Sequence, residues 1–563
     1  MSHPSGEDSS QLSDIRAHYQ DGSLKGDIIL SNGRIHTMNA ANQIVSVVAV
    51  RAGKIVYAGN DESEAARQFL QPPRIVDLHN RLAIPGLIDC HNHIVLFGNR
   101  PGHHTPLENA SSIADVQETY RERAQTVPDG QFITTIGGFH PGQFRERRLP
   151  TLAELDQAVP NHPAFVSFGF SGSAATNTLG KAFFTGVTIG TDGSIAEGDE
   201  NGKALLALRQ QLTFDDRKRG VRDAMAYAVS LGVTTHLDQG AFPASNTPSD
   251  GSGHEDNNTM HLPFLSVYND GDATIRLRIN FLTMDATSDT PTLTARIQNA
   301  FRFFGNDMVR TGSMGEFVTV DYAGGPVFDV AIREVREAGW RLEVHSITPT
   351  DYQTQVEAFE QLDAEMSIKD LRWVIAHVPF ILDDFIVRLK TLGCGVNLSS
   401  YQYLNTLNGI VSPAGPPYRS IVDSGIHAGI GGDGMQIAML NPWVQLYYAT
   451  TGKNAQGDIV NPNQQITRQE ALHLYTQANQ WLLGKPDEDL LGALEVGRLG
   501  DLVVLSDDYF SVSDEDLKKL KSVLTVVGGV VVHATDEFQS LRISQDTAQL
   551  TSPSNQRSSC ISM

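Results

Sequence analysis

The feature that most constrains the fold is a repeated alternation of short β-prone runs with helical segments in the middle of the chain. The runs are GVTTHLDQG, IRLRINFLTM, GEFVTVDYAG, RLEVHSI, LRWVIAHVPFI, CGVNLSS and HAGIGGDG. Segments between them, such as DVAIREVREAG, carry apolar residues at i, i+3 and i+4, which is typical of helices. Repeated β–α units predict a parallel sheet covered on both faces. The strand count of about eight favours a closed (β/α)8 TIM barrel over an open doubly wound sheet.

The two ends of the chain share a different residue pattern. Residues 26–85 and 488–540 are β-rich with Gly-containing turns, as in GKIVYAG and VLTVVGGVVVHA. Together they predict one small β-sandwich built from both termini, which leaves 86–487 for the barrel. Residues about 96–220 are rich in Gly, Pro and polar residues. They interrupt the rhythm after the first strand and predict an insertion over one barrel mouth.

Composition excludes some partners and favours others. The 563 residues include 43 Lys and Arg against 65 Asp and Glu, a formal charge of −22. That balance argues against nucleic acid, because phosphate binding needs clustered Lys and Arg. No apolar run approaches the roughly 18 residues of a membrane span. The expected partner is a small-molecule substrate, and a homodimer is left open.

The extreme ends and the cysteines suggest a cytoplasmic protein. Residues 1–25 are polar, have no apolar signal-peptide core, and predict a flexible arm. Residues 541–563 are Ser-rich and predict a disordered tail. Three cysteines are too few for a disulfide framework. Cys560 begins a loose C-a-a-X prenylation pattern, but no polybasic second signal accompanies it, so a chance cysteine is the preferred interpretation.

Polar side chains fall where barrel strands would end. His91 and His93 lie two residues apart in the first strand-like run, so one strand points both imidazoles into the same space. His345, His377 and Asp433 each close a later run. Each of these residues alone is a weak signal, but the ordered set at the C-terminal face of a barrel indicates a metal site. Imidazole and carboxylate ligands suit Zn²⁺, and also Mn²⁺ or Fe²⁺.

These motifs resemble the amidohydrolase superfamily, specifically its amidohydrolase-3 branch of metal-dependent hydrolases. The matching segments are PGLIDCHNHI, RLEVHSI, WVIAHVPFI, GGDGMQIAMLNPW, ITRQEALHLYTQANQWLLG and GALEVGRLGDLVVLS, in the family's order. The resemblance covers about residues 26–535. It implies a (β/α)8 barrel, a β-sandwich from both termini, one or two divalent metals, and hydrolysis of C–N or related bonds.

Two departures from the family pattern concern the site. Many members carry a carboxylated Lys in the fourth-strand motif, but TGSMGEFVTVDYAGG contains no Lys. Glu316 is the expected replacement as a metal ligand, and Asp321 is the alternative. Ser173 stands where members often have His, which changes the expected substrate pocket. His236 and Asp238, at another strand end, are further candidates for substrate binding, or they satisfy each other.

The predicted reaction is attack of a metal-activated water on an amide-type carbon. The metal set is predicted as His91, His93, Glu316, His345, His377 and Asp433. Bound metal brings the pKa of water to about 7. Asp433 would take the proton and pass it to the leaving amine, and His377 would share charge on the substrate oxygen. A lyase or decarboxylase reaction at the same centre, and a non-catalytic relative, are the alternatives.

Overall fold

The computed structural model describes residues 13, 15–169, 172–241, 260–409, 411–435 and 438–541. At the centre lie two parallel four-stranded sheets. The first has the order β10 (Leu87–Asn92), β16 (Val233–Asp238), β17 (Arg276–Phe281) and β18 (Val309–Met314). The second has the order β19 (Glu343–Ser346), β20 (Val374–His377), β21 (Gly395–Leu398) and β22 (His427–Ile430).

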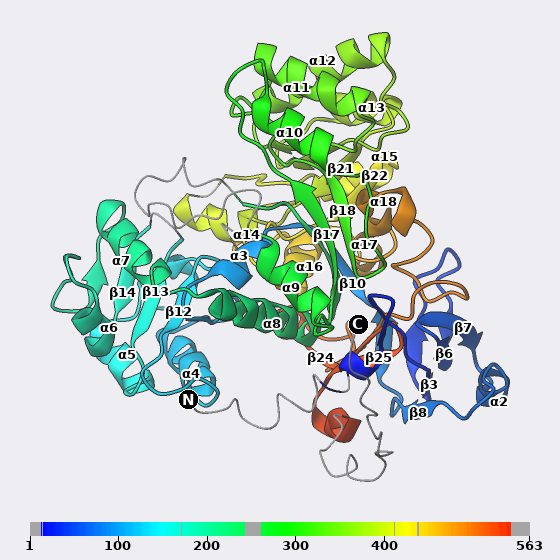
Figure 1. Cartoon of the computed structure of the whole chain (residues 1–563), viewed down its shortest axis with the longest axis horizontal. Coiled ribbons are helices and arrows are strands. Elements are labelled where there is room, and N and C mark those ends of the chain that lie inside the picture. The colour runs from blue at the N-terminus through cyan, green and yellow to red at the C-terminus, as the bar shows by residue number, and fades with distance from the viewer. Residues whose placement is uncertain are drawn as a thin grey trace, which may run out of the picture.

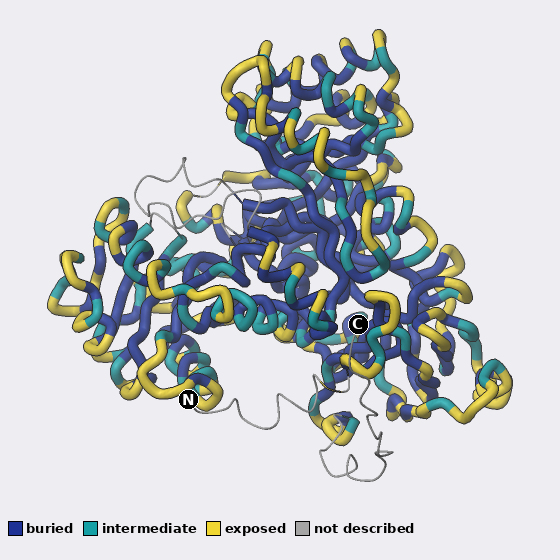
Figure 2. Tube along the Cα trace, viewed as in Figure 1, coloured by how far each residue is buried: buried dark blue, intermediate teal, exposed yellow. Residues whose placement is uncertain are grey.

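The two sheets meet along both of their edges. A parallel bridge pairs Met314, at the end of β18, with Leu342, just before β19. On the other side, the backbone N–H of Asp433, after β22, donates to the carbonyl of His91 in β10 at 2.7 Å. The central strands are almost wholly buried, whereas the surrounding helices expose their outer faces (Figure 2). The carboxyl ends of strands from both sheets therefore meet in one place.

Helices alternate with these strands, as the sequence pattern predicts. Figure 1 shows α10 to α13 as a lobe above the strands. The helices of this region are α3 (Ile94–Asn99), α8 (Phe214–Ser230), α9 (Leu262–Asn269), α10 (Pro291–Asn299), α11 (Pro326–Glu337), α12 (Pro349–Glu365), α13 (Asp383–Thr391), α14 (Gln402–Asn405), α15 (Tyr418–Ser424), α16 (Pro442–Thr451), α17 (Arg468–Leu474) and α18 (Asn479–Leu483). The result is a mixed α/β fold.

One predicted strand lies elsewhere. The fourth strand is β18, with sequence VRTGSM, and it ends before the predicted run GEFVTVDYAG begins. Gly315 adopts φ +120°, a conformation that L side chains rarely take, and a Cβ there would lie 1.9 Å from the carbonyl oxygen of Glu343. Phe317 and Val318 are both buried although they are adjacent, so the segment lacks the alternation of a half-buried strand. It forms a loop that delivers Glu316.

The segment predicted as an insertion forms a subdomain with its own sheet and its own hydrophobic clusters. It extends to the left of the central strands in Figure 1. Its strands are β11 (His103–His104), β12 (Ile133–Ile136), β13 (Ala164–Ser167), β14 (Ala174–Thr176) and β15 (Ser194–Ile195). Its helices are α4 (Ile113–Ala124), α5 (Leu152–Ala158), α6 (Thr178–Phe183) and α7 (Asp199–Arg209).

Strands from both ends of the chain form a six-stranded sheet, and N-terminal strands alone form a four-stranded sheet. The two sheets share one hydrophobic cluster. The six-stranded sheet runs β25 (Val530–Ala534), β24 (Ser522–Val527), β23 (Leu502–Leu505), β9 (Leu82–Pro85), β4 (Arg34–His36) and β5 (Ile44–Val45). The four-stranded sheet runs β7 (Lys54–Gly59), β6 (Val47–Arg51), β3 (Ile28–Ser31) and β8 (Arg74–Asp77). Two short helices, α2 (Glu62–Ala66) and α19 (Asp514–Leu517), accompany them.

Part of the predicted N-terminal arm is packed against the fold. Strands β1 (Tyr19–Gln20) and β2 (Ser23–Leu24) form a hairpin, and Ile15 is 1% exposed. Arg16 Nε lies 2.5 Å from Asp272 Oδ1. Burial of Ile15 and the ion pair between Arg16 and the buried Asp272 attach this polar segment to the fold, which its composition does not reveal. Residues 1–12 and most of the predicted tail, 542–563 with Cys560, lie outside the described residues.

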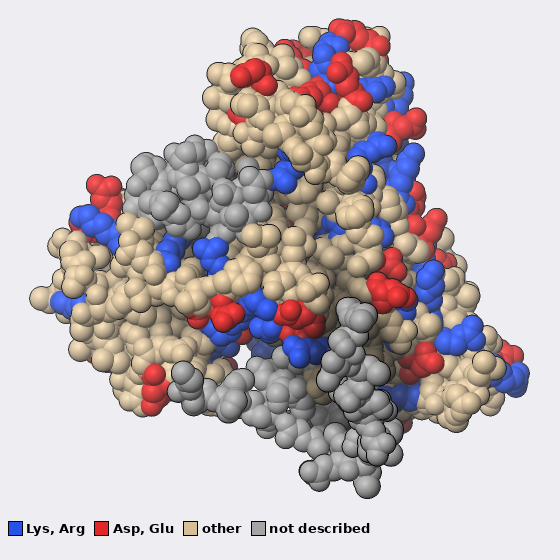
Figure 3. All heavy atoms as spheres, viewed as in Figure 1, with Lys and Arg blue, Asp and Glu red and all other residues tan. Residues whose placement is uncertain are grey.

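Among the described residues, no helix is long and apolar enough to cross a membrane. On the face drawn in Figure 3, acidic and basic side chains are interspersed. Two cysteines fall in the described part of the chain, Cys90 and Cys394, and both are buried free thiols.

A buried ion pair joins the central strands to the terminal sheets, and breaking it should destabilise that junction. Arg276 of β17 binds Asp501, just before β23, through two contacts of 2.7 Å. Removing one charge of a buried pair leaves the other uncompensated. We expect Asp501→Asn to lower the free energy of unfolding by about 3–5 kcal/mol, measured by urea denaturation.

The control is Asp508→Asn, which breaks the more exposed pair with Arg34 at 3.0 Å. Its expected cost is about 0–1 kcal/mol, because surface pairs contribute little. If both variants lost the same free energy of unfolding, the buried pair would not contribute more to stability than the exposed one.

Candidate metal centre

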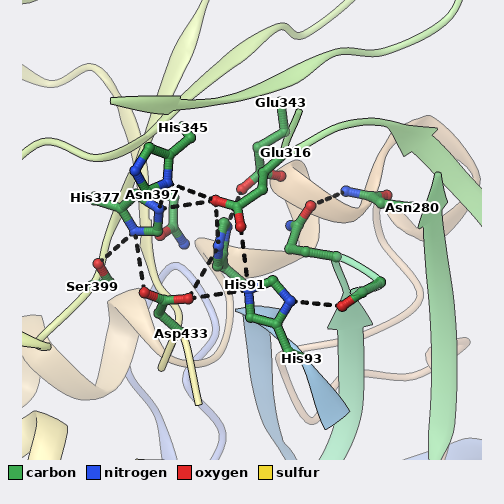
Figure 4. A network of polar contacts seen from close by, with 12 residues as sticks. His91, His93, Asn280, Glu316, Glu343, His345, His377, Asn397, Ser399 and Asp433 are labelled. Atoms are coloured by element: carbon green, nitrogen blue, oxygen red, sulfur yellow. Dashed lines mark hydrogen bonds and ion pairs between the residues drawn. The ribbon is translucent and has the colours of Figure 1, made fainter. Parts of the chain in front are cut away.

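Six side chains converge where the central strands end (Figure 4). His91 lies within β10, and His93 follows that strand directly. His345 and His377 belong to β19 and β20. Glu316 and Asp433 lie on the loops that follow β18 and β22. The site thus draws on both parallel sheets.

Glu316 is the hub of this cluster. Its Oε2 lies 3.0 Å from His345 Nδ1, 3.0 Å from His377 Nε2 and 3.5 Å from His91 Nε2. Its Oε1 lies 3.2 Å from His93 Nε2. One carboxylate therefore contacts four imidazoles, and its two oxygens face different members of the set.

Asp433 closes the opposite side of the cluster. Its Oδ1 lies 3.2 Å from His93 Nε2 and 3.8 Å from His91 Nε2. Its Oδ2 lies 3.9 Å from His377 Nδ1. His345 Nδ1 and His377 Nε2 are themselves 2.9 Å apart. All six residues predicted as metal ligands are therefore neighbours in space.

Hydrogen bonds on the far sides of the rings set their orientation. His93 Nδ1 donates to the carbonyl of Gly240 at 2.7 Å, which turns Nε2 toward the two carboxylates. His377 Nδ1 lies 2.8 Å from the hydroxyl of Ser399. His91 Nδ1 lies 2.6 Å from Glu343 Oε1. Such partners hold imidazoles in the orientation that metal ligation needs.

The donor set fits a divalent cation. Donor atoms of His91, Glu316, His377 and Asp433 all lie within 4.8 Å of one another, and all four residues are buried. The Nε2 atom of His91 is buried and has no hydrogen-bond partner among the described residues. A buried polar atom without a partner is costly. A cation between these groups would satisfy it, and imidazole with carboxylate is a ligand mixture that zinc accepts.

Both carboxylates are held in their charged forms. Burial alone would raise the pKa of Glu316, but hydrogen bonds from His345 and His377 and the other nearby imidazoles hold that pKa well below its usual range. Burial likewise opposes charge on Asp433, and the neighbouring imidazoles of His377 and His93 outweigh it, so its pKa is lowered. Ionised carboxylates at neutral pH are what metal ligation and proton acceptance require.

Two of the residues hold left-handed backbone conformations. His377 has φ +70° and Asp433 has φ +54°. This region costs an L residue roughly 1–2 kcal/mol, although Asp tolerates it better than most. Backbone strain of this kind gathers at functional sites, where the surrounding structure enforces it.

The structure places the other predicted site residues away from these contacts. Asp238 accepts hydrogen bonds from Val95 N and Gly240 N, each at 3.0 Å, and Oδ2 lies 2.7 Å from His261 Nε2. His236 Nδ1 lies 2.8 Å from the amide of Asn92. Neither residue pairs with the other in these contacts.

Ser173 and Asp321 complete the comparison with the sequence predictions. Ser173 is half-buried in the subdomain, just before β14. The roles of Ser173, His236 and Asp238 in substrate binding stay predictions. The exposed Asp321 lies five residues beyond Glu316. Glu316, and not Asp321, makes the contacts described for the cluster.

Sequence reasoning missed the residues behind the ligands. Glu343 and Arg341 lie two and four residues before His345, so strand alternation puts all three on one face. That spacing in RLEVH was a usable signal. Gly240 and Ser399 act through a carbonyl and a hydroxyl, and nothing in the sequence marks them.

Comparison with known proteins agrees with this geometry. The model of the Amidohydrolase family matches residues 74–533. An N-substituted formamide deformylase from Arthrobacter pascens is 23% identical over 90% of this chain and 98% of its own length. The Protein LONG AFTER FAR-RED 3 of Arabidopsis thaliana is 21% identical over 90% of this chain and 91% of its own.

Solved structures share the mixed α/β fold. An uncharacterized metal-dependent hydrolase from Pyrococcus horikoshii superposes with a TM-score of 0.58 at 16% identity, covering 87% of this chain and 99% of that chain. The atrazine chlorohydrolase from Arthrobacter aurescens complexed with zinc gives a TM-score of 0.54 at 17% identity, covering 90% and 95%. With a family model that spans most of its length, the chain belongs to the amidohydrolase family.

Proposed function

We propose that the protein is a metal-dependent hydrolase that cleaves a C–N bond of the amide type, other than a peptide bond, in a small molecule. The observation that carries the proposal is the largely buried cluster of four imidazoles and two carboxylates around His91 Nε2, which has no hydrogen-bond partner among the described residues. Family membership supports it, as do relatives named as hydrolases or as a deformylase.

We propose that the scaffold is a (β/α)8 barrel over residues 86–487, with an insertion at about 96–220. The bridge between Met314 and Leu342 and the hydrogen bond from Asp433 to His91 support closure of the two parallel sheets into one barrel. The shared hydrophobic cluster of the terminal sheets supports a β-sandwich over 26–85 and 488–540.

The proposed metal ligands are drawn from His91, His93, Glu316, His345, His377 and Asp433, and the favoured ion is Zn²⁺. A divalent ion held there would supply Lewis acidity and bring the pKa of water to about 7. The two oxygens of Glu316 face different imidazoles, so this carboxylate could help to hold either one ion or two.

The protein side chains would manage protons and charge. Asp433 is ionised, buried and next to His93 and His377, so it can accept a proton from the attacking water and return it to the leaving amine. His377, held by Ser399, would stabilise negative charge that develops on the substrate oxygen. Burial of the cluster strengthens these electrostatic effects.

The proposal is tested by metal analysis followed by a substrate panel. We expect purified protein that has never met a chelator to contain at least one divalent transition metal per chain, because the cluster is preformed. The panel holds N-substituted formamides, other N-acyl amines, lactams and aryl amides. Chelation should abolish any hydrolysis, and added zinc should restore it. Protein with only traces of metal would contradict the proposal.

The role of Asp433 is tested by Asp433→Asn, which keeps the size of the side chain and removes the proton acceptor. We expect kcat to fall by roughly 10²–10⁴-fold, the usual contribution of a proton-transfer residue. Asp321→Asn is the matched control, since Asp321 is exposed and five residues from Glu316. Unchanged kcat in the Asp433 variant at full metal occupancy would assign the proton to another group.

Glu316→Gln tests the ligand that stands in place of the family's lysine. The amide cannot carry the charge that four imidazoles face, so we expect a lower metal content, most clearly for a second, weaker ion. Wild-type activity should not depend on bicarbonate during metal reconstitution, because the segment has no Lys to carboxylate. If the variant kept its metal content and rate, Glu316 would not be a ligand.

A further inference from the structure

A column of charged and polar side chains, Arg341, Glu343 and His345, runs from the cluster along one face of a single extended segment. Arg341 lies two residues before Glu343, the first residue of β19, and Glu343 and His345 alternate within that strand, so the three side chains point the same way. His345 contacts Glu316, and Glu343, two residues earlier in the chain, contacts His91 (Figure 4). The column connects the cluster to the protein interior.

The contacts within this column are specific. His91 Nδ1 donates to Glu343 Oε1 at 2.6 Å. Arg341 Nη2 donates to Glu343 Oε2 at 3.0 Å, and Nη1 donates to Ser313 Oγ of β18 at 2.8 Å. Glu343 is 0% exposed and Arg341 is 3% exposed. Each oxygen of Glu343 therefore has its own partner.

Stability alone does not account for this arrangement. A buried ion pair loses several kcal/mol of hydration per ion, and apolar side chains of similar volume often serve a core as well or better. Barrel interiors are usually filled by Val, Ile and Leu. A buried Glu paired to Arg inside this one points to a task that apolar residues cannot perform.

The three rings with an identified partner behind them differ in the nature of that partner. His93 donates to the carbonyl of Gly240, and His377 faces the hydroxyl of Ser399. Both partners are neutral, whereas the partner of His91 is the carboxylate of Glu343. A carboxylate behind an imidazole fixes the tautomer and makes the opposite nitrogen a stronger donor to metal. That opposite nitrogen is the unpartnered Nε2 of His91.

We propose that Glu343, held by Arg341, is a positioning residue that makes His91 the strongest imidazole ligand of the centre. Glu343 keeps the proton on Nδ1 and aims Nε2 at the space between Glu316 and Asp433. Arg341 keeps the carboxylate of Glu343 in place and balances its charge. This inference rests on the metal centre of the proposed function and does not depend on the substrate.

The test compares zinc binding in the wild-type protein and in Glu343→Gln. Glutamine keeps the shape and an acceptor oxygen but makes the partner of His91 neutral, like those of His93 and His377. We expect zinc affinity to fall by about 10–100-fold, the usual effect of removing such a partner. The dissociation constant is measured by competition with a chromophoric chelator. The absorption spectrum of the Co²⁺-loaded protein, which reports the ligand field, should change with it.

A matched control separates positioning from loss of a buried ion pair. Asp487 binds Arg278 through two contacts of 2.7 Å, and both residues are buried. Asp487→Asn makes the same change of carboxylate to amide, but none of the cluster's contacts involves Asp487. We expect it to lower the unfolding temperature while leaving zinc affinity and the Co²⁺ spectrum at wild-type values.

A second variant covers the case in which Glu343→Gln does not fold. Arg341→Lys keeps a positive charge near Glu343 but loses the fork that also reaches Ser313. We expect its zinc affinity to fall below the wild-type value, by less than the about 10–100-fold expected for removing the carboxylate. Wild-type affinity in Arg341→Lys together with a Glu343→Gln protein that is unfolded would count against the proposal.

The outcomes distinguish this inference from the proposed function. Unchanged zinc affinity and spectrum in Glu343→Gln, or an equal loss in Asp487→Asn, would overturn the role of Glu343. A wild-type protein that does not bind zinc, Mn²⁺ or Fe²⁺ would overturn both proposals. A selective loss of zinc affinity in Glu343→Gln, in a protein that hydrolyses no member of the panel, would support the positioning role and refute the proposed activity.

Discussion

The carboxylate of Glu316, buried among four imidazoles, is the interaction on which the rest of the site depends. An ionised carboxylate away from water is tolerated only when charged or polar partners surround it. His91, His93, His345 and His377 supply those partners from strands of both central sheets. The scaffold must therefore bring the carboxyl ends of distant strands to one place, which a parallel arrangement of strands achieves.

The interior of the protein also contains buried ion pairs between arginine and a carboxylate. Besides Glu343 with Arg341, two arginines of β17, Arg276 and Arg278, bind Asp501 and Asp487. The two pairs formed by Arg276 and Arg278 link segments that are distant in the sequence, so each helps to fix where one segment meets another. Glu343 differs from the other two carboxylates because it also contacts a proposed metal ligand. Buried ion pairs thus have a structural role at Asp501 and Asp487 and a proposed positioning role at Glu343.

Much of the architecture could be predicted from the sequence because strand and helix periodicity is a local property. The runs around His345, His377 and Asp433 lie on β19, β20 and after β22 as expected. The run GEFVTVDYAG was wrong as a strand, because Gly315 ends β18 with a conformation that a local pattern does not reveal. The prediction of a flexible arm does not hold for Arg16, because this residue binds Asp272, which lies 256 residues away along the chain.

The sequence by itself determined which residue types are present and in what order: the H-x-H pair, the later histidines, Asp433, and a fourth-strand segment with no Lys. Tertiary structure decided that Glu316 rather than Asp321 contacts the histidines, that Asp238 accepts a hydrogen bond from Val95 at the start of α3, and that Glu343 lies behind His91. The physical reason is that a side chain's chemistry decides whether it can bind a metal, and the sequence gives that chemistry. Which side chains contact one another depends on distances between segments that only packing brings together.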